Sequence, residues 1–145
     1  MAVKNVRLIN DLWTSARNFK KDTDDDDLLF HIVKEMDSAK RSKMISDFDY
    51  GLLDCYLTDS RKSKFYRMAK LDLFNLTAQA NKCHIQAKNN KLDDMSEYYD
   101  NVYTGLYRII RKRRLTDEYD IYFFTSATIA HRKDWTQWQV QDRRL

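Results

Sequence analysis

Residues 60–88 read SRKSKFYRMAKLDLFNLTAQANKCHIQAK, and this stretch decides the fold that the sequence predicts. Its apolar residues recur at alternating steps of three and four, which places them on one face of a helix. A stripe of this kind needs a second helix to lie against. We therefore predict a long helix from about Ser60 to about Lys88, with a seam formed by Tyr66, Ala69, Leu73, Leu76, Ala80, Cys83 and Ala87.

The segment that follows predicts the partner of this helix. The residues NNKLDD (89–94) are typical of a turn, in which Asp93 or Asp94 caps the next helix. Apolar spacing then continues to about Arg113. Because the connection between the two helices is short, we expect them to be antiparallel neighbours.

Three more amphipathic helices are expected in the first 60 residues. The first runs from about Val3 to about Lys20. The second follows the acidic run DTDDDD (22–27), whose aspartates oppose the positive end of a helix dipole. The third places Met44 and Tyr56 on one face, with Ser42 or Asp47 near its start.

Composition agrees with an all-α fold. The chain of 145 residues has no proline and only two glycines, so the residues that shape hairpins and tight loops are nearly missing. We expect one domain, an antiparallel bundle of about four main helices over residues 1–115. Residues 116–145 are expected to form a C-terminal helical extension packed on the same domain.

The C-terminal extension leaves one alternative open. Thr116, Asp117 and Glu118 are typical of a helix start, but the aromatic and β-branched residues of 119–130 are also compatible with a strand. Helical spacing continues through this segment, so helix is the favoured interpretation. Trp135 and Trp138 lie one turn apart and predict a short final helix that docks two indoles or contacts a partner.

Charge is distributed unevenly along the chain. Residues 1–60 hold 9 Lys and Arg against 12 Asp and Glu, whereas residues 61–145 hold 17 against 10. The second part is therefore the candidate for contact with an anionic partner. No apolar run approaches the length of a membrane span and no secretory signal is recognisable, so we expect a cytoplasmic protein.

A dense basic cluster ends the predicted helix before Leu115. The stretch RIIRKRRL (108–115) has five basic side chains in eight positions, and one or two would suffice to complement a helix dipole. If the two long helices are antiparallel, the basic residues near Arg61 meet this cluster at one end of the bundle. The residues expected to contact phosphates are Arg61, Lys64, Arg67, Arg108, Arg111, Lys112, Arg113 and Arg114, with Tyr66, Tyr103 or Tyr107 available for stacking.

Known catalytic and metal-binding patterns do not fit the sequence. The acidic run lacks the glycine and the final bidentate acid of a calcium loop. His31 and Glu35 form a single i,i+4 pair, which is usually a surface contact. Cys55 and Cys83 are expected to be free thiols on apolar helix faces. We therefore expect no enzyme, no metal and no cofactor.

The stretch from Arg61 to Arg114 resembles the second half of a small four-helix-bundle family. That family includes the accessory variability protein of diversity-generating retroelements and the bundle protein encoded by ribosomal intervening sequences. The similar features are a long helix with basic residues at its start, a short break, and the helix MSEYYDNVYTGLYRIIRKRR, with Gly105 before Ile109 and Ile110. The resemblance implies a homo-oligomeric ring that binds nucleic acid beside a reverse transcriptase. It carries over Arg61, Lys64 and Arg67 as nucleic-acid contacts.

Two hypotheses about function follow. The leading one is a non-enzymatic accessory protein that binds RNA or single strands through its basic end. The alternative is a protein interaction module, a small adaptor or inhibitor, which uses the acidic face at Asp22–Asp27 or the tail with Trp135 and Trp138.

Overall fold

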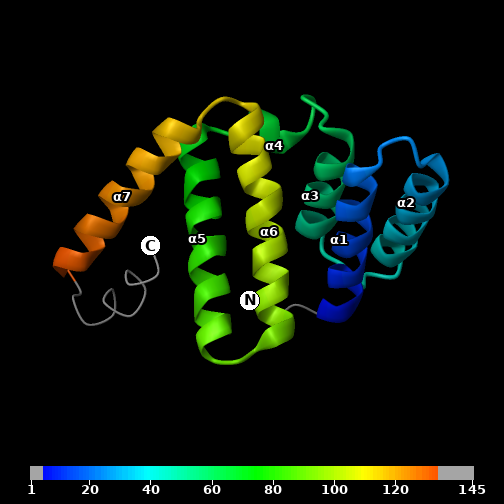
Figure 1. Ribbon diagram of the computed structural model, residues 1–145, viewed down its shortest axis with the longest axis horizontal. Coiled ribbons are helices and arrows are strands. Elements are labelled where there is room, and N and C mark those ends of the chain that lie inside the picture. The colour runs from blue at the N-terminus through cyan, green and yellow to red at the C-terminus, as the bar shows by residue number, and fades with distance from the viewer. Residues whose placement is uncertain (1–4, 134–145) are drawn as a thin grey trace. The chain divides into compact units, whose positions relative to one another are not determined.

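The computed structural model describes residues 5–133, with side chains up to residue 125, and every regular element in this range is a helix (Figure 1). The all-α prediction is therefore confirmed, and residues 119–130 belong to a helix. The helices are α1 (Val6–Lys21), α2 (Asp26–Arg41), α3 (Asp47–Thr58), α4 (Lys64–Arg67), α5 (Lys70–Asn89), α6 (Asp93–Lys112) and α7 (Thr116–Lys133).

The chain forms two compact units, Met1–Arg67 and Met68–Leu145. The first contains α1 to α4 and the second contains α5 to α7. The expectation that residues 1–115 act as one bundle stays a prediction.

The first unit is built on three helices with matching apolar faces. α1 packs against α2 and α3, and Trp13 of α1 meets Tyr56 of α3 edge to face at 5.2 Å between ring centroids. Side chains also cap the helix starts. The carboxylate of Asp25 accepts from the Leu28 amide at 2.9 Å, and the Ser46 hydroxyl accepts from the Asp49 amide at 3.0 Å. The acidic run therefore caps α2 as predicted, and Ser46 caps α3, which begins at Asp47, one of the two residues expected near its start.

The second unit is an antiparallel hairpin of α5 and α6 on which α7 packs (Figure 1). Residues 90–92 connect the two long helices, as the short turn predicts. Leu73 and Leu106 are fully buried, and Phe74 meets the buried Tyr119 of α7 edge to face at 5.5 Å. Apolar contact among all three helices thus forms the core of this unit.

The predicted helix from Ser60 to Lys88 is wrong in its first third. Only one helical turn, α4, forms there, and Ala69 is extended (φ −56°, ψ 136°) before α5 begins at Lys70. Serines offer the backbone other bonds in this segment, since the Ser63 hydroxyl accepts from the Phe65 amide at 3.2 Å. The seam on α5 also shifts, and its buried residues are Leu73, Phe74, Thr77, Ala80 and Ala87.

Three helices end in the same way although no glycine is present. Lys43, Lys91 and Arg114 follow α2, α5 and α6 with φ of 56°, 58° and 59°. The next amide in each case bonds back five residues, as from Leu92 to the Ala87 carbonyl at 2.9 Å. This is the Schellman geometry, in which glycine is the least strained residue.

We expect Lys91→Gly to raise the free energy of unfolding by about 0.5–1 kcal/mol, because glycine relieves the left-handed strain. Gln79→Gly is the matched control, since Gln79 is exposed inside α5. It should lower the free energy of unfolding by about 1 kcal/mol. Urea unfolding measures both, and a destabilised Lys91→Gly variant would contradict the geometry.

Tyr50 makes the first unit sensitive to alkaline pH. Its hydroxyl donates to Asp37 Oδ1 at 2.6 Å, and Lys40 Nζ lies 4.4 Å from its ring centroid. The bond to Asp37, then burial, then the charges of Asp37 and Asp54 raise the pKa of Tyr50 from 10.0 to about 12. Because the folded pKa is the higher one, the stability held by this proton is present below pH 10 and is lost as the pH rises toward 12.

The variant Tyr50→Phe should therefore be less stable than the wild type near neutral pH, by about 1 kcal/mol for one lost hydrogen bond. The difference should shrink as the pH rises from 10 to 12. Urea unfolding at several pH values measures it. A difference that stays constant across this window would mean that the hydroxyl proton is not held as described.

Candidate nucleic-acid interface

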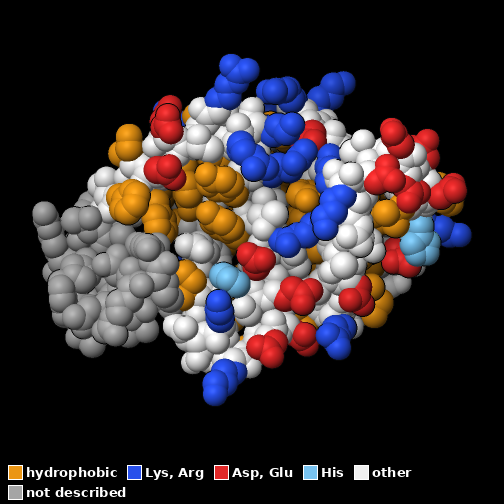
Figure 2. All heavy atoms as spheres, viewed as in Figure 1, with side chains coloured by type: hydrophobic (Ala, Val, Ile, Leu, Met, Phe, Trp, Pro, Cys, Tyr) orange, Lys and Arg blue, Asp and Glu red, His pale blue; other side chains and the backbone are white. Residues whose placement is uncertain are grey.

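The C-terminal end of α6 presents exposed positive charge. α6 ends at Lys112, Arg113 is the C-cap, and Arg114 takes the left-handed conformation that turns the chain toward α7. Arg111, Lys112 and Arg114 are exposed, whereas Arg108 and Arg113 are half-buried. Figure 2 shows Lys and Arg side chains over the upper end of α6. We call Arg111, Lys112 and Arg114 the α6 basic cluster.

Within the described part of the chain, the acidic residues that follow form no ion pair with this cluster. Glu118 pairs with Lys70 at 2.6 Å and so ties α7 to the start of α5. Among residues with described side chains, no carboxylate forms an ion pair with Arg111, Lys112 or Arg114. Charges that repel one another at a helix end favour an external anion beyond what the dipole accounts for.

Arg113 has a different role from its neighbours. Its Nη1 donates to the Met68 carbonyl at 2.8 Å, at the point where the chain is extended before α5 begins. The guanidinium therefore satisfies a carbonyl that no helix engages there. The prediction that Arg113 contacts phosphates remains, but its side chain is already used to join the end of α6 to the start of the second unit.

The residues of the first unit that were predicted to contact phosphates lie on the loop after α3 and on α4. Arg61, Lys64 and Arg67 are all exposed, as is Lys62. The Arg61 guanidinium lies 5.9 Å from the Tyr66 ring centroid, and Lys64 Nζ lies 5.4 Å from that of Phe65. We call Arg61, Lys64 and Arg67 the α4 basic cluster. Its merger with the α6 basic cluster into one patch stays a prediction.

A larger group of aromatic rings lies beside the α6 basic cluster, and the sequence indicated only part of it. Tyr103 and Tyr107 stack at 5.7 Å with an interplanar angle of 22°, and Tyr107 meets Tyr119 at 6.0 Å. Burial is the first cause that raises the pKa of both Tyr103 and Tyr119. Helical spacing could have revealed the group, which comprises Phe74, Tyr103, Tyr107, Tyr119, Tyr122, Phe123 and Phe124.

The other sequence-based candidates fall into simpler roles. His31 and Glu35 pair at 2.8 Å on an exposed face of α2, which is the predicted surface contact. Cys55 and Cys83 are free thiols, buried and half-buried respectively. Residues 5–125 contain no group of three side chains that could hold a metal ion. Trp135 and Trp138 lie outside the described residues.

No family model, curated protein or solved structure gives a significant match to the chain. The resemblance to the retroelement and intervening-sequence bundles therefore remains a similarity of pattern. No helix within the described residues is long and apolar enough to cross a membrane.

Proposed function

We propose that this chain is a non-enzymatic accessory protein that binds RNA or single strands through phosphate contacts. The single observation that supports it most is the α6 basic cluster, which is exposed at a helix end and has no carboxylate partner among the described residues. The α4 basic cluster would add contacts of the same kind. Such contacts bind the phosphate backbone without reading its sequence.

Salt dependence is the direct test of this proposal. Each phosphate contact releases bound counterions, so the logarithm of the binding constant falls linearly with the logarithm of salt concentration. Fluorescence anisotropy should record binding to labelled RNA and single-stranded DNA that weakens steeply between about 50 and 200 mM salt. The absence of binding to any nucleic acid at low salt would refute the proposal.

The family resemblance adds a partner and an assembly to the proposal. In that reading the protein assists a reverse transcriptase and forms a homo-oligomeric ring. Light scattering of the purified protein tests the ring, and co-purification with a reverse transcriptase from a neighbouring gene tests the partner. A strict monomer would remove the ring from the proposal and leave nucleic-acid binding standing.

One observation favours the alternative of a protein interaction module. Phe30 on α2 is 71% exposed, close in sequence to the acidic run that caps this helix. An apolar ring amid carboxylates suits a partner with a basic rim and an apolar pocket. Loss of partner capture on Phe30→Ala, together with no nucleic-acid binding, would favour this function over the first.

A further inference from the structure

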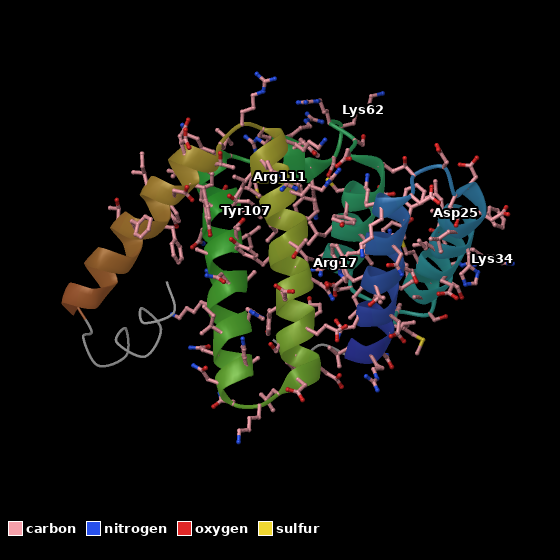
Figure 3. All side chains as sticks on the ribbon, in the orientation of Figure 1. Arg17, Asp25, Lys34, Lys62, Tyr107 and Arg111 are labelled. Carbon is pink, nitrogen blue, oxygen red and sulfur yellow. The ribbon has the colours of Figure 1, made fainter. Side chains whose placement is uncertain are left out.

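Two tyrosines and an arginine share one face of α6. Tyr103, Tyr107 and Arg111 follow one another at steps of four residues, which places them in a row along the helix. Each step advances about 6 Å along the axis. Figure 3 shows Tyr107 and Arg111 on this helix, with Arg111 nearer its C-terminal end. The row thus passes from aromatic rings to the α6 basic cluster.

Contacts with neighbouring rings order the side chains of Tyr103 and Tyr107. The rings of Tyr103 and Tyr107 lie nearly parallel, and the Tyr119 ring lies 6.0 Å from that of Tyr107 at an interplanar angle of 72°. Tyr119 is itself buried and contacts Phe74. Tyr103 and Tyr107 nevertheless remain half-exposed. Rings that are already ordered lose little conformational entropy when a ligand stacks on them.

We infer that this row is a stacking site for the unpaired bases of a single strand, whose phosphates lie along the α6 basic cluster. The inference rests on the proposed function and names its substrate class. Every base has a π face, so stacking on tyrosine tolerates any sequence. The bases of a duplex already stack on one another and cannot reach the rings. The site therefore distinguishes unpaired from paired bases, which phosphate contacts alone do not.

The test uses three labelled probes of about 12 nucleotides: a single strand, a strand of abasic sites with the same backbone, and a duplex. We expect Tyr107→Leu to weaken binding of the single strand about 5- to 150-fold, the effect typical of one lost base stack. Binding of the abasic strand and the duplex should not change. Tyr107→Phe keeps the π face and should bind the single strand like the wild type.

Two further variants separate stacking from other effects. Phe30→Leu is the matched control, because the Phe30 ring is 71% exposed on α2, a helix that carries neither basic cluster. It should leave all three affinities unchanged. Arg111→Ala removes a phosphate contact and should weaken all three probes alike.

The possible outcomes distinguish the inference from the function on which it rests. If no probe binds at low salt, both fail. If the single strand binds but Tyr107→Leu does not weaken it, or weakens the abasic strand equally, the stacking site is refuted while phosphate binding stands. Far-UV circular dichroism of each variant establishes that its helices are intact before affinities are compared.

Discussion

A triple variant, Arg111→Ala, Lys112→Ala and Arg114→Gly, is expected to lose roughly 10- to 100-fold of its affinity for nucleic acid at low salt. This loss of affinity corresponds to about 0.5–1 kcal/mol for each of the three exposed charge contacts. The slope of the logarithm of affinity against the logarithm of salt should fall by about 2–3, since each lost phosphate contact removes about 0.7–0.9. Fluorescence anisotropy at several salt concentrations measures both quantities.

The three substitutions are chosen so that folding is not disturbed. Alanine at the last two positions of α6 has high helix propensity. Glycine suits position 114, where φ is 59°. A loss of affinity in this variant would therefore reflect the charges. Arg113 is left in place because its bond to the Met68 carbonyl would confound the result.

A second triple variant controls for net charge. Lys34, Arg41 and Lys88 are exposed and lie outside both basic clusters. Their replacement by alanine removes the same three charges from the net charge of +4. Affinity should change far less in this control. Equal losses in the two variants would show that total charge, not the end of α6, attracts the nucleic acid.

Substituting the α4 basic cluster, alone and together with the α6 basic cluster, tests whether the two clusters bind the same strand. Arg61→Ala, Lys64→Ala and Arg67→Ala remove the α4 basic cluster. If one strand contacts both clusters, this variant should also weaken binding, and its effect should add to that of the α6 variant. No effect from the α4 variant would restrict the interface to the second unit.

The helices with a clear apolar stripe could be predicted from the sequence because one face of each must be buried. The expected α1, from Val3 to Lys20, differs from Val6–Lys21 by only a few residues. The pairing of α5 with α6 followed from the apolar seam and from the short connection predicted at residues 89–94. The periodicity of apolar residues reflects the burial of one helix face and can be read from the local sequence.

The break between α4 and α5 could not be predicted because its causes are not local. Met68 and Ala69 favour helices, and no proline or glycine stands nearby. The chain is extended there, and two contacts flank the break. Phe65 is buried against α3, and the side chain of Arg113, 45 residues away, donates to the Met68 carbonyl. Tertiary contacts thus override propensity.

The sequence predicted which basic residues gather at the candidate site, but it did not predict which of them are exposed and which bond within the fold. The five basic residues of 108–115 are equivalent in the sequence, yet the fold exposes three of them, and the Arg113 guanidinium donates to the Met68 carbonyl. The end of α6 was also hard to predict, since Arg114 takes the left-handed conformation that glycine usually adopts after a helix. The exposure of each basic residue depends on the residue at which α6 ends, and the composition of the cluster does not predict that residue.

The buried ring of Phe65 anchors α4, and with it the α4 basic cluster, to α3. Phe65 is 1% exposed, and its ring meets Phe48 of α3 edge to face at 5.7 Å. Gly51 on the same helix also faces this ring, and a Cβ there would lie in ordinary van der Waals contact with it at 3.5 Å. One buried side chain therefore attaches a segment that has only a single turn of helix of its own.

Phe65→Ala is expected to lower the free energy of unfolding by about 3–5 kcal/mol, through lost burial and the cavity that remains. Phe30→Ala is the matched control, because the same change at a ring that is 71% exposed should cost less than about 0.5 kcal/mol. Phe65→Leu should restore most of the loss, since it refills the cavity. Urea unfolding of the three variants measures these differences. Equal stability of Phe65→Ala and Phe30→Ala would mean that α4 is not anchored by its ring, and that the charges of Arg61, Lys64 and Arg67 are not held in place by the fold.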